Sequence, residues 1–138
     1  MGAMAGKPKR SRAPAGRRTH RQRIGKAAED IAADFLRAQG VEILERNYLR
    51  RVGELDIVGR DRDVLVVVEV RTRISDRFGG AAASVDVRKQ RRLIRASALF
   101  LQHRKGLAHL RVRFDVVVVS DLAGPSPRVQ WLRHAFLT

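Results

Sequence analysis

The sequence predicts an α/β fold in which a mixed central sheet is flanked by helices, and two observations support the prediction. Two long segments with apolar residues at helical spacing alternate with short runs rich in valine and isoleucine, in the order α-β-β-β-α-β-β. The 138 residues, 44% of them apolar, are enough for one hydrophobic core, and no internal repeat divides them. We therefore expect a single domain over residues 24–138.

The N-terminal segment, residues 1–23, is predicted to be a disordered basic tail. It contains eight Lys or Arg residues, no acid and no apolar periodicity. The first helix should follow at Ile24, because apolar residues then recur every three or four positions and Gly40 can end the helix. The expected apolar face consists of Ile24, Ala28, Ile31 and Phe35.

The remaining elements are predicted from the alternation of apolar runs with turn residues. The turn sequence GRDRD, residues 59–63, should join the second and third strands as a hairpin. Residues 74–84 should form a loop. We expect strands at residues 41–50, 53–59, 64–73 and 110–120, a second helix at residues 85–105, and a short closing edge strand at residues 129–136.

The charge of the chain favours a polyanionic partner. The net charge is +15, and outside the tail 21 basic residues still face 14 acidic ones. Solubility, or a genome that prefers arginine, is the alternative explanation, since the chain has 24 Arg and only 5 Lys. Aromatic residues are scarce at 5%, which argues against a base-stacking platform for single strands. Duplex or branched DNA is the expected partner.

Several classes of protein are excluded or disfavoured by what the chain lacks. It has no cysteine, which excludes disulfides, thiolate zinc sites and cysteine nucleophiles. No apolar run approaches the roughly 18 residues of a membrane span, and the N-terminus has no apolar stretch typical of a signal peptide. We therefore expect a cytoplasmic protein with no membrane partner.

Charged side chains interrupt the second and third predicted strands. Glu54 and Asp56 are two residues apart on one strand, and Glu69 and Arg71 are two apart on the next, so each pair should share a face. The hairpin would bring the two pairs together, and converging carboxylates are the hard oxygen ligands that Mg²⁺ or Mn²⁺ requires. The alternative is that Glu69 and Arg71 form an exposed pair on an edge strand.

An acid on one strand followed by acid-x-base on the next resembles the hallmark of the PD-(D/E)XK nuclease superfamily. The chain as a whole resembles the YraN family of small bacterial proteins, which are similar to archaeal Holliday-junction resolvases. The resemblance extends from Gly25 to Phe136. The matching segments are GKAAEDIAADFLRAQG, ILERNYLRRVGELDIV, VVVEVRTR, FGGAAASVDVRKQRRL, RFDVVVV and VQWLRHAF.

This resemblance implies a restriction-endonuclease-like core with a metal-dependent nuclease site that uses Mg²⁺ or Mn²⁺. Asp56 and Glu69 would be the central metal ligands and catalytic acids, with Glu54 beside them. Glu29 would be an accessory catalytic acid, although a solvated helix acid is the alternative. Arg71 stands where the family usually has Lys. It can supply charge and bidentate hydrogen bonds but cannot lose a proton near neutral pH, so catalysis is either retained through charge stabilisation or lost.

The second predicted helix carries a basic stripe. Four arginines at i, i+3, i+4 and i+7 spacing are expected to contact the DNA backbone, with a solvated face as the alternative. Lys89 lies off the stripe, at the border of the core, and could supplement the catalytic charge of Arg71. The stripe consists of Arg88, Arg91, Arg92 and Arg95. The expected apolar face of this helix consists of Val87, Ile94, Ala98 and Leu101.

Three functional hypotheses follow. The first is a Mg²⁺- or Mn²⁺-dependent endonuclease that hydrolyses phosphodiester bonds in structured or branched DNA. The second is a non-catalytic nucleic-acid-binding protein that retains the nuclease fold. The third is an accessory protein that recruits partners through the tail of residues 1–23. The resemblance also implies a homodimer, and Asp115, which interrupts the fourth strand, is expected to pair with a nearby arginine.

Overall fold

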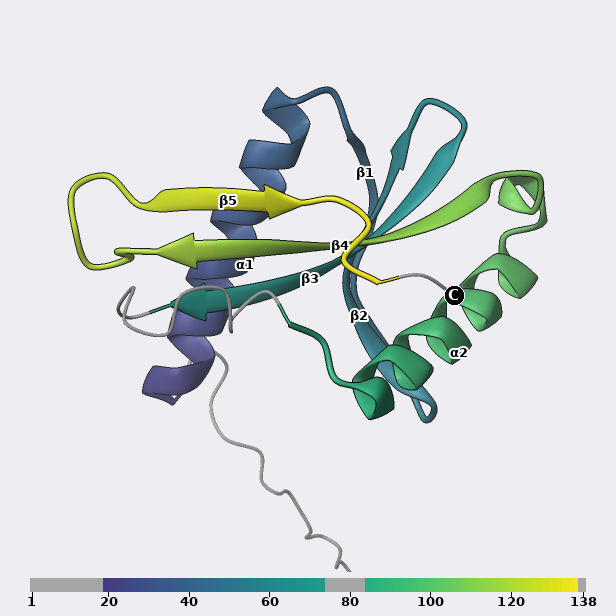
Figure 1. Cartoon of the computed structure of the whole chain (residues 1–138), viewed down its shortest axis with the longest axis horizontal. Helices are drawn as coiled ribbons and strands as arrows, with labels where there is room; N and C mark the ends of the chain where they lie inside the picture. The colour runs from purple at the N-terminus through teal and green to yellow at the C-terminus, as the bar shows by residue number, and fades with distance from the viewer. Residues whose placement is uncertain (1–18, 74–83, 137–138) are drawn as a thin grey trace, which may run out of the picture.

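A computed structural model describes residues 19–73 and 84–136 (Figure 1). The predicted loop of residues 74–84 lies outside these ranges except for Ser84, as does nearly all of the predicted tail. The order of the predicted helices and strands is confirmed, with one extra 3-10 turn before the fourth strand. The elements are α1 (His20–Ala38), β1 (Glu42–Arg50), β2 (Gly53–Asp61), β3 (Val64–Arg73), α2 (Val87–His103), η3 (Lys105–Leu107), β4 (Arg111–Ser120) and β5 (Arg128–Leu132).

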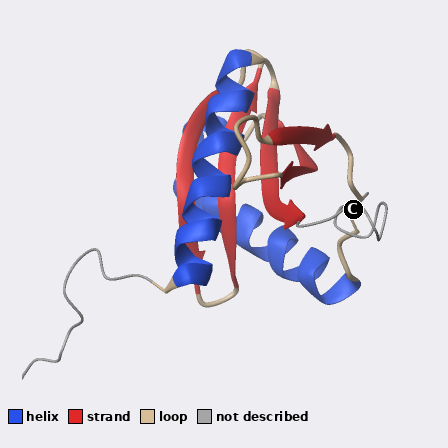
Figure 2. Ribbon diagram, turned by 90° about the vertical axis from the view of Figure 1, so that its left-hand side faces the viewer, coloured by secondary structure: helices blue, strands red, loops and turns tan. Residues whose placement is uncertain are grey.

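The five strands form one mixed sheet in the order β1-β2-β3-β4-β5. Neighbouring strands are antiparallel except for β3 and β4, which are parallel and joined through α2. Residues that alternate along β3 and β4 pack into two separate apolar clusters, one containing α1 and the other α2. The two helices therefore cover opposite faces of the sheet, as Figure 2 shows. None of the described helices combines the length and apolar character needed to cross a membrane.

Helix α1 begins at His20, four residues before the predicted start, so residues 20–23 belong to the helix and not to a tail. The reason is a capping box. The Thr19 hydroxyl accepts a hydrogen bond from the Gln22 N–H at 3.1 Å, and the Gln22 side chain accepts one from the Thr19 N–H at 3.0 Å. The predicted apolar face is confirmed in part, since Ala28 is buried and Ile31 and Phe35 pack, half-buried, against the core. The fully buried residues of the helix are Ala28, Glu29, Ala32, Ala33 and Leu36.

The predicted apolar face of helix α2 is confirmed in part, since Ile94 and Leu101 pack, half-buried, against the core. Val87, the first residue of the helix, is 57% exposed. Small side chains on the buried face let the helix lie close to β2. At Gly53 a Cβ atom would lie only 2.9 Å from the Arg92 carbonyl oxygen. The buried residues are Leu93, Ala96, Ser97 and Phe100.

The β1–β2 ribbon is bent where Asn47 and Asp56 face each other. Leu55 packs in the cluster with α2, whereas Ile57 packs in the cluster with α1. In a regular strand residues two apart share a face, so the alternation is broken at Asp56. Asn47, between the paired positions on either side, has the left-handed φ of 54°. Glu54 and Asp56 nevertheless line the same cavity, as predicted for two side chains that share a face.

The last strand is shorter than predicted, ending at Leu132 instead of residue 136. His134 has a φ of 55°, which turns the chain out of the strand, and its N–H donates to the Asp115 carboxylate at 3.1 Å. That carboxylate also accepts hydrogen bonds from the Arg113 guanidinium and the Trp131 indole N–H. The predicted pairing of Asp115 with an arginine is confirmed, and the cluster ties β5 and the residues after it to β4.

Candidate active site

Glu69 lies in the middle of the sheet and not on an edge strand. β3 is the central strand, and Glu69 is only 6% exposed, which excludes the interpretation of Glu69 and Arg71 as an exposed edge pair. The hairpin pairing of β2 with β3 runs up to Ile57 and Val68. The next residue on each strand is Asp56 and Glu69, respectively, so the predicted hairpin brings the two acids to adjoining positions.

The Asp56 carboxylate takes the place of a backbone acceptor where β2 separates from β3. Its Oδ2 atom accepts the Val70 N–H at 2.9 Å. Burial, and then the negative charges of Glu69 and Glu54, raise the pKa of Asp56 from 3.8 to about 7, against the opposing effect of the Val70 hydrogen bond. A cation bound beside the Asp56 carboxylate would oppose both causes of this rise, because it favours the charged form.

Glu69 is contacted by two cations from different elements. Its Oε2 atom accepts a hydrogen bond from Arg71 Nε at 3.1 Å and lies 3.4 Å from Lys89 Nζ, and Arg71 Nη1 donates to the Ser84 carbonyl at 3.1 Å. Lys89 lies in the first turn of α2, which Asp86 caps by accepting the Lys89 N–H at 2.9 Å. The structure therefore brings together Glu69, Arg71 and Lys89, as predicted.

The second oxygen of Glu69, Oε1, is buried and has no hydrogen-bond partner in the described part of the chain. A buried carboxylate oxygen without a donor is costly, and a bound cation would relieve that cost. Within residues 19–73 and 84–136, however, no three His, Asp or Glu side chains gather closely enough to hold a metal ion. The exposed Glu54, predicted as a third ligand, does not complete such a cluster. The described residues therefore provide two candidate metal ligands, Asp56 and Glu69.

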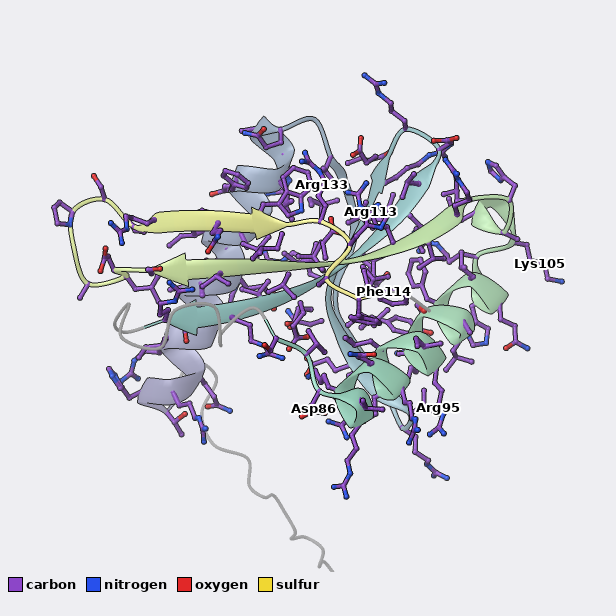
Figure 3. All side chains as sticks on the ribbon, in the orientation of Figure 1. Asp86, Arg95, Lys105, Arg113, Phe114 and Arg133 are labelled. Carbon is purple, nitrogen blue, oxygen red and sulfur yellow. The ribbon has the colours of Figure 1, made fainter. Side chains whose placement is uncertain are left out.

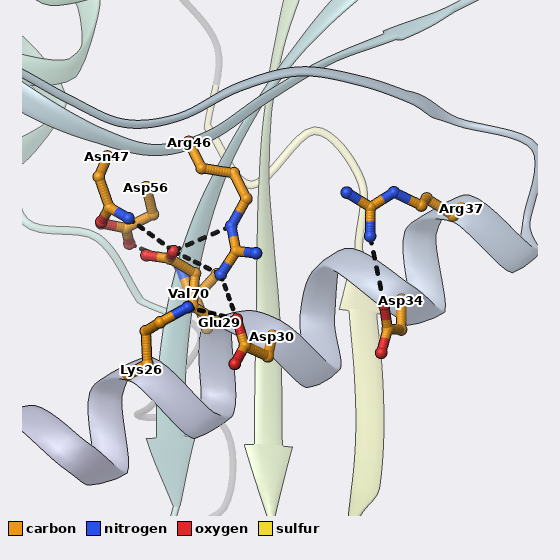
Figure 4. Close-up of polar contacts among 9 residues, drawn as sticks. All are labelled: Lys26, Glu29, Asp30, Asp34, Arg37, Arg46, Asn47, Asp56 and Val70. Atoms are coloured by element: carbon orange, nitrogen blue, oxygen red, sulfur yellow. Dashed lines mark hydrogen bonds and ion pairs between the residues drawn. The ribbon is translucent and has the colours of Figure 1, made fainter.

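Glu29 is buried at 8% exposure, so it is not the solvated helix acid of the alternative interpretation. Its Oε1 atom accepts hydrogen bonds from Arg46 Nε at 3.1 Å, Arg46 Nη2 at 2.8 Å and Asn47 Nδ2 at 2.9 Å (Figure 4). Arg46 also donates to Asp30, and this bond, followed by one from Lys26, lowers the pKa of Asp30. Sequence reasoning missed Arg46 and Asn47, because regular alternation would place neighbouring side chains on opposite faces.

A cavity of about 1370 Å³ opens beside these acids on the α1 side of the sheet. Its walls are the first half of α1, the end of β3 and the loop between β4 and β5. Three acids line it, Glu29 from α1 and both Glu54 and Asp56 from β2. The cations in the lining are Arg21, Lys26, Arg71 and Arg73. The cavity is large enough for a segment of a polymeric substrate, and it offers both signs of charge.

The arginines of the predicted stripe are all exposed along the outer side of α2. Figure 3 shows Arg95 pointing away from the sheet and Asp86 at the start of the helix. Hydrogen bonds from the Lys89 and Arg88 N–H groups, and then the charges of Arg92 and Arg88, lower the pKa of Asp86. Since Lys89 lies in the same helix, the stripe begins beside the acids and leads away from them. The structure does not test contact with DNA.

Fold and site together define a mixed α/β protein in which the buried Glu69, contacted by two cations, adjoins the half-buried Asp56, and Asp56 lines a large cavity. The chain belongs to the family described as "Uncharacterised protein family UPF0102", whose profile matches residues 28–119. This is the YraN family, so the resemblance is confirmed at the level of the family.

Three relatives named as UPF0102 proteins illustrate the similarity. The protein from Pseudomonas syringae pv. syringae is 44% identical over 86% of this chain and 97% of its own length. The protein from Pseudomonas entomophila is 47% identical over 81% and 91%, and that from Xanthomonas euvesicatoria is 49% identical over 84% and 93%, respectively. The similarity therefore covers nearly the whole domain. The names of these relatives do not state a function.

Proposed function

We propose that this chain is a Mg²⁺- or Mn²⁺-dependent endonuclease of restriction-endonuclease-like fold that hydrolyses phosphodiester bonds in structured or branched DNA. One observation supports this proposal above all others. Asp56 and Glu69 reach adjoining positions of a buried hairpin, and two cations, Arg71 and Lys89, are held beside them. Phosphodiester hydrolysis needs anionic ligands for a divalent ion and positive charge for the phosphate in this combination.

Asp56 and Glu69 would hold the divalent ion, and the unpartnered Glu69 Oε1 is the observation that fits such a ligand. When bound, the ion would polarise the phosphodiester and lower the pKa of a bound water. The protein contributes by fixing both carboxylates before substrate arrives. The Val70 N–H holds Asp56, and the Arg71 guanidinium holds Glu69.

Arg71 and Lys89 would stabilise the charge that develops on the phosphate. The water oxygen forms a bond to phosphorus while the bond from phosphorus to one sugar oxygen breaks. The leaving oxygen takes a proton from solvent, and the proton that the attacking water loses ends in solvent. Arg71 cannot accept this proton, but its charge and its hydrogen-bonding fork suit a phosphate. Lys89, which lies 3.4 Å from Glu69, supplies the ammonium group that position 71 lacks.

Cleavage assays test the proposal. Supercoiled plasmid, linear duplex and a four-way junction are incubated with the full chain and Mn²⁺, and products are separated on gels. We expect the wild type to cleave, and Asp56→Asn and Glu69→Gln to lose at least about 100-fold in rate. Asp63→Asn is the matched control, since its side chain is 77% exposed at the far end of the hairpin. Absence of cleavage by the wild type, or equal cleavage by Asp56→Asn, would end the enzyme proposal.

A non-catalytic DNA-binding protein is the second candidate, favoured by Arg71 and by the two-acid site in the described residues. Calorimetry with Mn²⁺ separates the candidates. Strong DNA binding without a heat of Mn²⁺ binding, and no cleavage after Arg71→Lys, would support the binder. The recruitment hypothesis concerns residues 1–23, which lie mostly outside the described ranges, and the homodimer also stays a prediction.

A further inference from the structure

The site contains a hydrogen-bond cluster that the sequence did not predict, built around Glu29. All three donors of the cluster contact one oxygen, Oε1. Within the described residues the other oxygen, Oε2, receives no hydrogen bond, and it does not belong to the fully buried unpartnered atoms. A carboxylate held by three donors on one side cannot rotate freely, so the direction of its second oxygen is fixed as well.

That fixed direction matters because of where the cluster lies. Glu29, Asn47 and Asp56 all line the same cavity, and they come from α1, β1 and β2, respectively. Figure 4 shows the Asn47 amide and the Asp56 carboxylate side by side above α1, with the Glu29 carboxylate between them and Arg46. A polar atom with no protein donor, in a water-accessible cavity beside a reactive carboxylate, is free to accept a hydrogen bond from water or substrate.

The bend in the backbone of β1 brings the Asn47 side chain to Glu29. Asn47 adopts a left-handed φ of 54°, and this conformation places the neighbouring side chains of Arg46 and Asn47 on the same side of β1. Asparagine tolerates this region better than most residues. Tyr48 then returns to the other face, where its ring packs on Phe100. Thus the bend that brings Asn47 to Glu29 occurs opposite Asp56, at the site itself.

We propose that Arg46 and Asn47 are positioning residues for the hydrolysis: they hold Glu29 so that its Oε2 faces the cavity and accepts a hydrogen bond from the attacking water. This inference rests on the proposed nuclease function. It also assigns a proton acceptor to the reaction, which the guanidinium of Arg71 cannot be. The proton lost by the water passes to Glu29 Oε2 and from there to solvent.

The kinetic test uses Asn47→Gly, because glycine keeps the left-handed backbone while removing the amide. With a junction or plasmid substrate and Mn²⁺, we expect kcat to fall by about tenfold or more, with KM within about twofold. DNA affinity measured in Ca²⁺ and the melting temperature should stay near those of the wild type. Arg46→Met should lower kcat likewise, but it should also lower the melting temperature, because it leaves the Glu29 carboxylate without its guanidinium partner. Arg46→Lys, which keeps one donor group, should recover part of the rate.

Arg37→Met is the matched control, since Arg37 forms an exposed ion pair with Asp34 on the same helix and lies outside the cavity lining. It should leave kcat unchanged. If Asn47→Gly keeps the kcat of the wild type, or if only its KM changes, the positioning role is overturned while the nuclease proposal stands. No cleavage by the wild type removes the nuclease proposal and the positioning role together.

A metal-free measurement tests the hydrogen bond independently of activity. Asn47 is the single asparagine of the chain, so isotope labelling of asparagine alone gives one side-chain amide signal in an NMR spectrum. In the wild type, one of its two protons should exchange slowly with solvent, because it is donated to Glu29. In Glu29→Ala both should exchange rapidly. Rapid exchange of both protons in the wild type would overturn the inference.

Discussion

The raised pKa of Asp56 gives the fold a pH dependence opposite to that of an ordinary ion-paired carboxylate. The pKa is about 7 in the folded chain, because of burial and then of the nearby Glu69 and Glu54, against an ordinary value of 3.8. The folded state therefore binds the proton more tightly than the unfolded state. Below about pH 4 Asp56 is protonated in both states, and it does not lower the free energy of unfolding. As the pH rises, its ionisation lowers the free energy of unfolding progressively, and the full loss is reached above about pH 7.

The perturbation that reveals this cost is Asp56→Asn, which removes the charge and keeps an acceptor for the Val70 N–H. At about 1.4 kcal/mol per pKa unit, the rise from 3.8 to about 7 corresponds to at most about 4 kcal/mol. Solvent screening of a half-buried group lowers this figure, so we expect a gain of roughly 2 kcal/mol at about pH 8.5. At about pH 4, where Asp56 is neutral, the gain should nearly vanish.

The assay is urea unfolding at both pH values in the presence of a chelator, with the variant compared with the wild type. Asp34→Asn is the control, since Asp34 is 80% exposed, and it should shift the free energy of unfolding by less than about 0.5 kcal/mol at either pH. Added Mn²⁺ should stabilise the wild type but not Asp56→Asn. An equal gain at both pH values would show that the charge of Asp56 is not its source, and the reasoning would fail.

Three further outcomes are expected. Asp115→Ala should destabilise the fold by about 3–5 kcal/mol in urea unfolding, because it leaves a buried guanidinium and an indole N–H without their acceptor; a loss under about 1 kcal/mol would contradict this. Gly53→Ala should cost about 1–3 kcal/mol by overpacking against α2, whereas Gly25→Ala, with open space around it, should cost nothing. Replacing Arg91 and Arg95 by Gln should weaken DNA binding and reduce its salt slope by about 2, and an unchanged slope would remove the stripe from the interface.

The parts of the structure that depend on local pattern could be predicted from the sequence. The order of helices and strands follows from apolar spacing, and the hairpin follows from its turn residues. Once the hairpin is in place, the adjoining positions of Asp56 and Glu69 follow from it. Lys89 could be placed near them because it lies at the border of the buried face of α2.

The parts that depend on packing between elements could not be predicted. The bend at Asn47 and Asp56 arises where β1 and β2 pass between the two apolar clusters, and no sequence period marks it. Burial of small residues on α2, such as Ala96, reflects how close the helix lies to the sheet, whereas hydrophobicity alone favours the larger Val87. The donors to Glu29 depend on that same bend, so they remained hidden as well.

The strand order has a consequence for how the chain folds. Every pair of neighbouring strands is also consecutive in the sequence, and β3 with β4 is the pair that needs a long crossover. Short loops close early, so the β1-β2-β3 meander, with Asp56 and Glu69 on it, can assemble before the crossover docks. Lys89, located in that crossover, arrives later. In a refolding experiment, mutations at the meander should slow folding, whereas mutations that loosen the docking of α2 should mainly speed unfolding.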